Sequence, residues 1–143
     1  MESPINFYSK TNFNLKDKVS YSKWVKAVIE SEGKDVGDLN YIFCSDDDLL
    51  YMNQRYLDHD TFTDIITFDY SEDDLISAEI YISIDRVKEN AKDFKVKFKN
   101  ELRRVIVHGV LHCCGYSDSS KELKAEMRAL ENKKIELFHV EQN

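Results

Sequence analysis

The stretch that decides the fold lies at residues 105–118 and reads VIVHGVLHCCGYSD. Apolar residues fill most of its first ten positions, and two histidines, His108 and His112, interrupt them four positions apart. On a helix of 3.6 residues per turn, side chains four positions apart project from the same face. The stretch therefore predicts a helix that packs against the interior and holds two imidazoles side by side.

Two imidazoles at this spacing can reach one divalent ion at about 2.0–2.1 Å. Gly115 is placed to end the helix, because glycine adopts the left-handed backbone without a side-chain penalty. The first carboxylate after that turn is Asp118. Two histidines and a carboxylate with one open position form a catalytic zinc pattern. We predict that His108, His112 and Asp118 bind one zinc ion per chain.

Ordinary structural roles compete with this interpretation. The histidines can be plain helix residues, and Asp118 can be a cap of the final helix. However, Ser119 and Glu122 have the Ser-x-x-Glu spacing of a capping box, so a cap at Ser119 leaves Asp118 for another use. The alternative third ligands are His139 and His59.

The three cysteines do not predict a disulfide framework. Cys44, Cys113 and Cys114 are odd in number, and neighbours in sequence rarely bridge. A metal-ligand role for Cys113 and Cys114 is possible, but buried free cysteine is common, and the inert interpretation is preferred. Neither a run of about 18 apolar residues nor a basic leader into an apolar segment occurs, so we expect a cytoplasmic protein with no membrane partner.

The pattern of elements predicts an α+β fold. A chain of 143 residues fits one domain, residues 1–143, whose core needs no disulfides. Strands are expected at 5–8, 39–44, 65–68 and 79–83, and helices at 22–32, 46–57, 85–94, 100–113 and 121–138. Strands that lead and helices that follow indicate a mixed sheet of about four strands packed with helices.

Charge is unevenly distributed along a chain whose net charge is −7. Residues 58–79 contain eight acidic side chains and no Lys or Arg, whereas residues 86–104 contain eight basic and three acidic side chains. The basic stretch is either a solvated face or a phosphate-binding patch. If it binds RNA, the candidate contacts on or before the histidine helix are Lys99, Arg103 and Arg104.

Several motifs together resemble the YbeY family of bacterial endoribonucleases. The motifs are the run His-Gly-x-Leu-His-x-x-Gly-Tyr at 108–116, Met52-Asn53, Tyr56, Asp60, the segments 63–68 and 79–83, Glu126-Met127 and Leu130-Glu131. The resemblance covers about residues 39 to 135. It implies a fold with a metal helix like that of zinc metallopeptidases. It also implies a zinc-dependent RNase specific for single-stranded RNA, which matures the 3′ end of 16S ribosomal RNA and acts in ribosome quality control. Its partners would be ribosomal RNA, the ribosome and possible ribosome-assembly proteins.

The chain departs from this family at four positions. Asp118 stands where the third ligand is usually His, and Ser117 precedes it where Asp is common. Leu57 stands where Arg usually follows the tyrosine, and Phe62 replaces the usual Pro before Thr-Asp. No catalytic residue is assigned outside the metal centre.

Two other functions are compatible with the sequence. A metallopeptidase is suggested by the histidine spacing, but such enzymes place Glu directly after the first His as general base, and this chain has Gly109. A non-catalytic ribosome-assembly module with a structural metal is favoured by Leu57.

Overall fold

The structure is a computed structural model that describes residues 4–58 and 62–142, with side chains as far as Phe138. Its strands are β1 (Ile5–Ser9), β2 (Asp35–Cys44), β3 (Ile65–Asp69) and β4 (Leu75–Ser83). Its helices are α1 (Lys18–Ser31), α2 (Asp46–Tyr56), α3 (Ile84–Asp93), α4 (Phe98–Cys113) and α5 (Lys121–Gln142).

The four strands form one mixed sheet in the order β1-β2-β4-β3. β2 is parallel to both of its neighbours, and β3 is antiparallel to β4. The predicted α+β class and the mixed four-stranded sheet are therefore confirmed. β3 is an edge strand, which leaves its outer side free to border a site.

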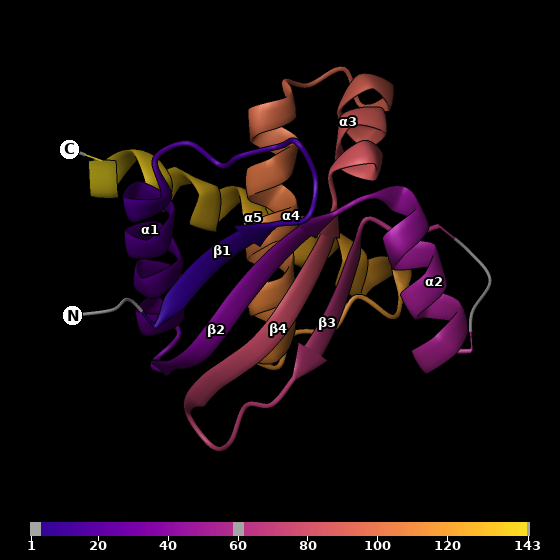
Figure 1. Cartoon of the computed structure of the whole chain (residues 1–143). Helices are drawn as coiled ribbons and strands as arrows, with labels where there is room; N and C mark the ends of the chain where they lie inside the picture. Colours follow the sequence, from indigo (N-terminus) through magenta and orange to yellow (C-terminus); the bar gives the residue numbers. More distant parts are fainter. Residues whose placement is uncertain (1–3, 59–61, 143) are drawn as a thin grey trace.

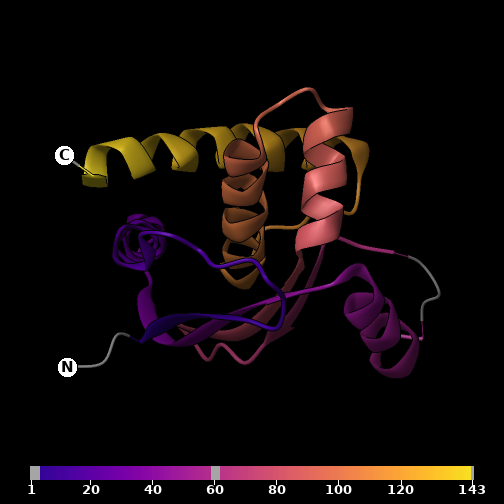
Figure 2. The same ribbon diagram turned by 45° about the horizontal axis from the view of Figure 1, so that its top comes forward.

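The helices lie in layers on the sheet (Figure 1). α1, α3 and α4 stand on one face, and α5 crosses above them on the outside (Figure 2). α2 packs on the opposite face, where Leu49 joins a small cluster with Ile42, Cys44 and Ile66. Within the described residues no helix is long and apolar enough to cross a membrane.

The main core surrounds α4. Leu102, Val105, Ile106 and Val110 of this helix are all buried against the sheet and the neighbouring helices. Gly109 allows α4 to lie close to the sheet, because a Cβ atom at this position would lie 3.0 Å from the Ile65 side chain of β3. The predicted helix is present, with both histidines on one face. The apolar face of α4 fixes the rotation of the helix and turns the histidines to the opposite side.

Four predicted boundaries are wrong by four residues, and two of them are the start of β4, at Leu75 instead of 79, and the end of α5, at Gln142 instead of 138. α1 begins at Lys18, not at 22, directly after Asp17 in a left-handed conformation with φ 62°. β2 begins at Asp35, not at 39, and continues across an irregular register between Val36 and Leu39. Gly37 permits this, since a Cβ there would collide with the Ser77 side chain.

Candidate metal centre

Two histidines of α4 meet at their Nε2 atoms. His108 and His112 project from the same face, and their Nε2 atoms lie 2.9 Å apart. The helix ends at Cys113, and Gly115 turns the chain with φ 107°. The amide of Tyr116 donates to the Leu111 carbonyl over 3.1 Å, which folds the turn back on the last helical residues. The turn predicted at Gly115 is confirmed.

The returning chain brings Asp118 to the histidine pair. Its carboxylate oxygens lie 3.4 Å from the Nε2 atom of His108 and 3.6 Å from that of His112. The three ligand atoms all lie within 4.8 Å of one another. The structure thus gathers the three predicted ligands at one point.

The other ring nitrogen of each histidine has a fixed partner. Nδ1–H of His108 donates to Oε2 of Glu131 on α5 over 2.6 Å, and Nδ1–H of His112 donates to the Tyr116 carbonyl over 2.9 Å. A neutral imidazole that donates from Nδ1 presents an unprotonated Nε2. Both rings are therefore held in the tautomer that a metal ligand needs, with outer partners of the kind typical of metal sites.

The donor set fits a divalent transition metal. Two unprotonated Nε2 lone pairs and a carboxylate facing each other at short distance repel unless a cation lies between them. Nitrogen and carboxylate ligands in this number suit zinc. Burial alone would lower the pKa of His108, but the hydrogen bond and charge of Glu131, together with Asp118 and Asp64, outweigh it and raise that pKa. The surroundings of the site thus favour positive charge at this point.

The ligand cluster stands between two cavities. One, of about 490 Å³, lies between α3, α4 and α5 and is lined by His108, Asp118 and Glu131. The other, of about 460 Å³, lies along β3 and is lined by both histidines, Asp118 and Leu57. Asp64 lines both cavities. The open side of the cluster therefore faces an extended groove, which we call the metal groove.

Asp64 carries a half-buried carboxyl group beside the cluster. Burial raises its pKa, although the nearby His108 and a backbone hydrogen bond act in the opposite direction. Asn90 of α3 donates to its Oδ2 atom over 3.3 Å. The aspartate is thus held in place at the junction of the two cavities.

Comparison with known proteins places the chain in a family. The family model described as endoribonuclease YbeY matches residues 6–139. The endoribonuclease YbeY of Flavobacterium psychrophilum is 55% identical over 139 residues, which cover 97% of this chain and 99% of that protein. The chain belongs to the YbeY family.

Other YbeY relatives agree with this assignment. The endoribonuclease YbeY of Flavobacterium johnsoniae is 51% identical over 96% of this chain and 99% of that protein. The solution structure of TM1509 from Thermotoga maritima superposes with a TM-score of 0.64 at 26% identity, covering 97% of this chain and 95% of that chain. Sequence and fold therefore correspond over nearly the whole length.

The three basic residues proposed to bind RNA are split between two faces of the YbeY domain. Arg104 lines the metal groove and donates to Glu131 over 3.0 Å and to Asn132 over 2.6 Å. Lys99 and Arg103 line a separate cavity. The helical period explains the division, because Lys99 and Arg103 point about 180° and about 140° away from His108.

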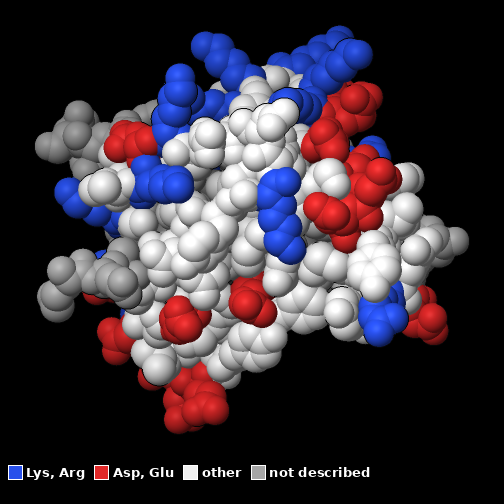
Figure 3. Space-filling model, in the orientation of Figure 1, with Lys and Arg blue, Asp and Glu red and all other residues white. Residues whose placement is uncertain are grey.

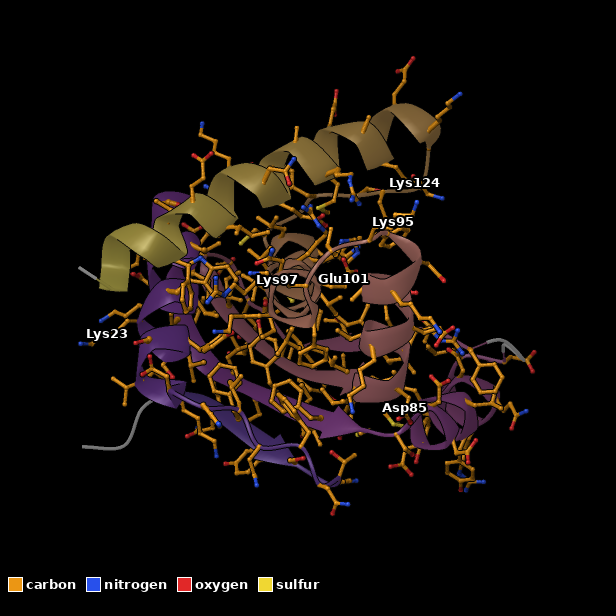
Figure 4. All side chains as sticks on the ribbon, turned by 90° about the horizontal axis from the view of Figure 1, so that it is seen from above. Lys23, Asp85, Lys95, Lys97, Glu101 and Lys124 are labelled. Carbon is orange, nitrogen blue, oxygen red and sulfur yellow. The ribbon has the colours of Figure 1, made fainter. Side chains whose placement is uncertain are left out.

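The metal groove contains further basic side chains that the sequence analysis did not identify. Lys124 and Arg128 of α5 line the same cavity as Arg104. Figure 4 shows Lys124 at the start of α5, extending toward the α3 side of the molecule. Figure 3 shows Lys and Arg side chains along the upper edge of one face, over the loop that joins α3 to α4. Spacing from α4 alone could not find residues that α5 contributes.

Glu131 was also without an assigned role. Its two oxygens bind Arg104 and His108, and its side chain is 6% exposed. A Glu among apolar positions of the final helix was the available signal. It was quoted for the family resemblance, but only the fold shows that it faces the first histidine.

The cap predicted at Ser119 is wrong by one residue. The Ser120 hydroxyl accepts from the Leu123 amide over 3.0 Å, whereas the Ser119 hydroxyl accepts from Ser117 over 3.0 Å. α5 begins at Lys121, so Ser120 is the residue in register to cap it. Asp118 is not needed as a cap in either register.

The remaining candidates are placed as follows. Cys113 is buried and Cys114 is half-buried, and burial raises the pKa of their thiols to about 12 and about 11. Among the described residues, neither sulfur joins the ligand cluster. His59 and the side chain of His139 lie outside the described residues.

Proposed function

We propose that this chain is a zinc-dependent endoribonuclease that cuts single-stranded RNA at the metal groove. The observation that carries the proposal is the cluster of His108, His112 and Asp118, with both histidine tautomers fixed for metal binding. Family membership supplies the class of reaction, since the similar proteins are named endoribonucleases. The domain is proposed to span residues 1–143.

The bound zinc ion would act as a Lewis acid toward phosphate oxygens and lower the pKa of a water molecule toward neutrality. His108, His112 and Asp118 hold the ion. Glu131 orients the His108 ring and makes it a stronger ligand, and the Tyr116 carbonyl does the same for His112.

The RNA backbone is proposed to lie along the metal groove. Arg104, Lys124 and Arg128 line the cavity on one side of the ligand cluster. Their charges would attract phosphates without regard to sequence, so binding should weaken with salt. Specificity for single-stranded RNA is part of the same proposal.

The biological setting follows from the family. The proposed substrate is ribosomal RNA, in particular the 3′ end of 16S ribosomal RNA, with the ribosome and ribosome-assembly proteins as partners. A role in ribosome quality control and a cytoplasmic location belong to the same proposal.

The direct test measures cleavage of a single-stranded RNA by protein stripped of metal and reloaded with zinc. Zinc should restore activity to the parent, and His112→Ala should lose both metal and cleavage because one of two nitrogen ligands is removed. Ser119→Ala is the matched control, since it lies close to Asp118 in sequence and its hydroxyl bonds only to Ser117. A His112→Ala protein with full metal content would contradict the proposed site.

The metallopeptidase alternative conflicts with the packing of α4. The residue after His108 would have to carry the general base, but Gly109 faces the sheet, where even a Cβ atom would come within 3.1 Å of Ile80. A glutamate has no room at this position. The non-catalytic alternative predicts RNA binding without cleavage at every zinc load, and the same assay decides it.

A further inference from the structure

A second cavity lies on the other side of α4, away from the metal groove. Its volume is about 460 Å³, and it is enclosed by the segment 12–17, the start of α1, the start of α4 and the end of α5. Figure 4 looks along α4 and shows α1 on one side of this helix and α3 on the other. We call the cavity on the α1 side the aromatic cavity.

Arg103 is a buried cation in this cavity. It is 7% exposed, and its Nε atom has no hydrogen-bond partner among the described residues. Its guanidinium carbon lies 3.8 Å from the centre of the Phe138 ring and 5.9 Å from that of Tyr21. Within residues 4–58 and 62–138, no carboxylate forms an ion pair with it. A buried charge without a counter-ion is costly, so the site is suited to an anion.

Other groups add to the positive charge of the aromatic cavity. Lys99 lies one helical turn before Arg103 on the same face, and Lys16 enters from the facing segment. The cavity also includes the first turn of α4, which has no side-chain cap at Lys97. Among the described residues, the first amide after Lys97 that has a hydrogen-bond partner is that of Asn100. Free amides at a helix start favour phosphate. Asp17 is the one carboxylate that the described residues contribute to the lining.

The walls are flat and apolar, with amides at the mouth. The rings of Phe13 and Phe98 lie 5.7 Å apart and tilted by 67°, and both line the cavity with Tyr21. Asn12 and Asn14 are polar residues of the facing segment. Aromatic faces stack on nucleobases, and side-chain amides can bond to base edges. The volume is within the usual range of small-ligand sites, about 300–1,000 Å³.

We propose that the aromatic cavity binds a phosphorylated nucleoside, with the phosphate at Arg103, Lys99 and the start of α4 and the base against the aromatic wall. The nucleotide can be free or can be the 5′ end of an RNA strand, because both present the same group. The proposal does not depend on the proposed cleavage reaction, since none of these residues belongs to the metal groove.

The test is calorimetric titration of the full-length chain at low salt with adenosine 5′-monophosphate and with a 5′-phosphorylated RNA tetranucleotide. Arg103→Met should weaken binding at least about tenfold, because a charged bidentate contact to phosphate is lost. Adenosine without phosphate should bind weakly to the parent. His112→Ala should bind adenosine 5′-monophosphate as well as the parent, because His112 does not line the aromatic cavity.

Two matched lysine variants distinguish specific binding in the aromatic cavity from nonspecific attraction to basic surface charge. Lys99→Gln removes an exposed lysine that lines the cavity, and Lys95→Gln removes an exposed lysine four residues earlier that does not. Only Lys99→Gln should weaken binding, by several-fold. Because Arg103→Met alters the core, its unfolding transition is also measured. If Arg103→Met does not fold, the comparison of Lys99→Gln with Lys95→Gln tests the proposal.

The binding results distinguish a free nucleotide from an RNA end as the ligand. Binding of both probes indicates a site for free nucleotides, and binding of the tetranucleotide alone, weakened in Lys99→Gln but not in Lys95→Gln, indicates an RNA end. The proposal is overturned if neither probe binds at millimolar concentration, if Lys95→Gln and Lys99→Gln weaken binding equally, or if binding of adenosine 5′-monophosphate disappears in His112→Ala.

Discussion

Replacement of Lys134 by Met should destabilise the protein far more than loss of a surface lysine. Nζ of Lys134 lies 2.8 Å from Oε2 of Glu32 and donates to the Ser31 hydroxyl over 2.7 Å. The two charged side chains are 8% and 15% exposed, so this ion pair clamps α5 to the end of α1 almost out of contact with water. Met fills a similar volume but leaves the Glu32 charge without its cation.

The size of the stability loss in Lys134→Met depends on the burial of Glu32, the partner that remains. Removing one member of a buried pair costs about 3–5 kcal/mol, because the remaining charge stays desolvated. Glu32 keeps a 2.6 Å hydrogen bond from the Tyr116 hydroxyl and some contact with solvent, so we expect a loss near 3 kcal/mol, the lower end of that range. The exposed pair of Lys34 and Asp74 is the control, and Lys34→Met should cost about 0–1 kcal/mol.

Urea unfolding followed by circular dichroism measures both values. Glu32→Gln added to Lys134→Met should restore part of the loss, since the amide oxygen still accepts from Tyr116 and no charge is stranded. Equal losses for Lys134→Met and Lys34→Met would show that the pair at the α1–α5 junction is solvated, and the reasoning would fail.

Acid provides an independent check on the same pair. Burial alone would raise the pKa of Glu32, but hydrogen bonds from Lys134 and Tyr116 outweigh it and lower that pKa. A carboxyl group with a lowered pKa adds stability above its unfolded value of about 4.3 and loses that contribution as the pH falls through the folded pKa. The advantage of the parent over Lys134→Met should therefore shrink below about pH 4.3.

Three further predictions concern the metal groove. Glu131→Gln should weaken zinc binding by about tenfold, measured by competition with a chromophoric chelator, because the His108 ring loses its charged acceptor. In the same assay Asp118→His should keep the ion and Asp118→Ala should lose affinity; unchanged affinity in Asp118→Ala would remove Asp118 from the ligand set. Replacing Lys124 and Arg128 together by Gln should reduce the salt dependence of RNA binding, whereas Lys23→Gln, which points away from the groove in Figure 4, should not.

Most of the fold follows from local patterns in the sequence. The strand at Ile65–Asp69, the second half of the strand at Leu75–Ser83 and the helix ending at Cys113 lie where apolar spacing predicts them, because each buries one regular face. The errors arise where backbone geometry departs from the regular pattern. Asp17 adopts a left-handed conformation, and Gly37 allows β2 to continue past an irregular register, and neither feature changes the apolar period.

The candidate site was predictable only as far as one helix and its turn extend. His108, His112 and Asp118 lie within eleven residues, so helical spacing and one glycine turn were enough to group them. Glu131 comes from another helix, and its position depends on how α5 packs across α4. Arg103 and Arg104 were both predicted to contact RNA because they are neighbours in the basic stretch, but they line different cavities.

The partners that fix the two histidine rings link the metal centre to the packing of the whole domain. Nδ1 of His112 bonds to the Tyr116 carbonyl, while the hydroxyl of the same tyrosine donates to Glu32, which in turn pairs with Lys134. The turn that carries Asp118 is thereby tied to both α1 and α5. Because the ligand positions rest on these long-range contacts, separation of α1 from α5 would release the turn and weaken metal binding before α4 itself unfolds. Bound metal should correspondingly stabilise the α1–α5 junction, since ligand binding and folding are linked.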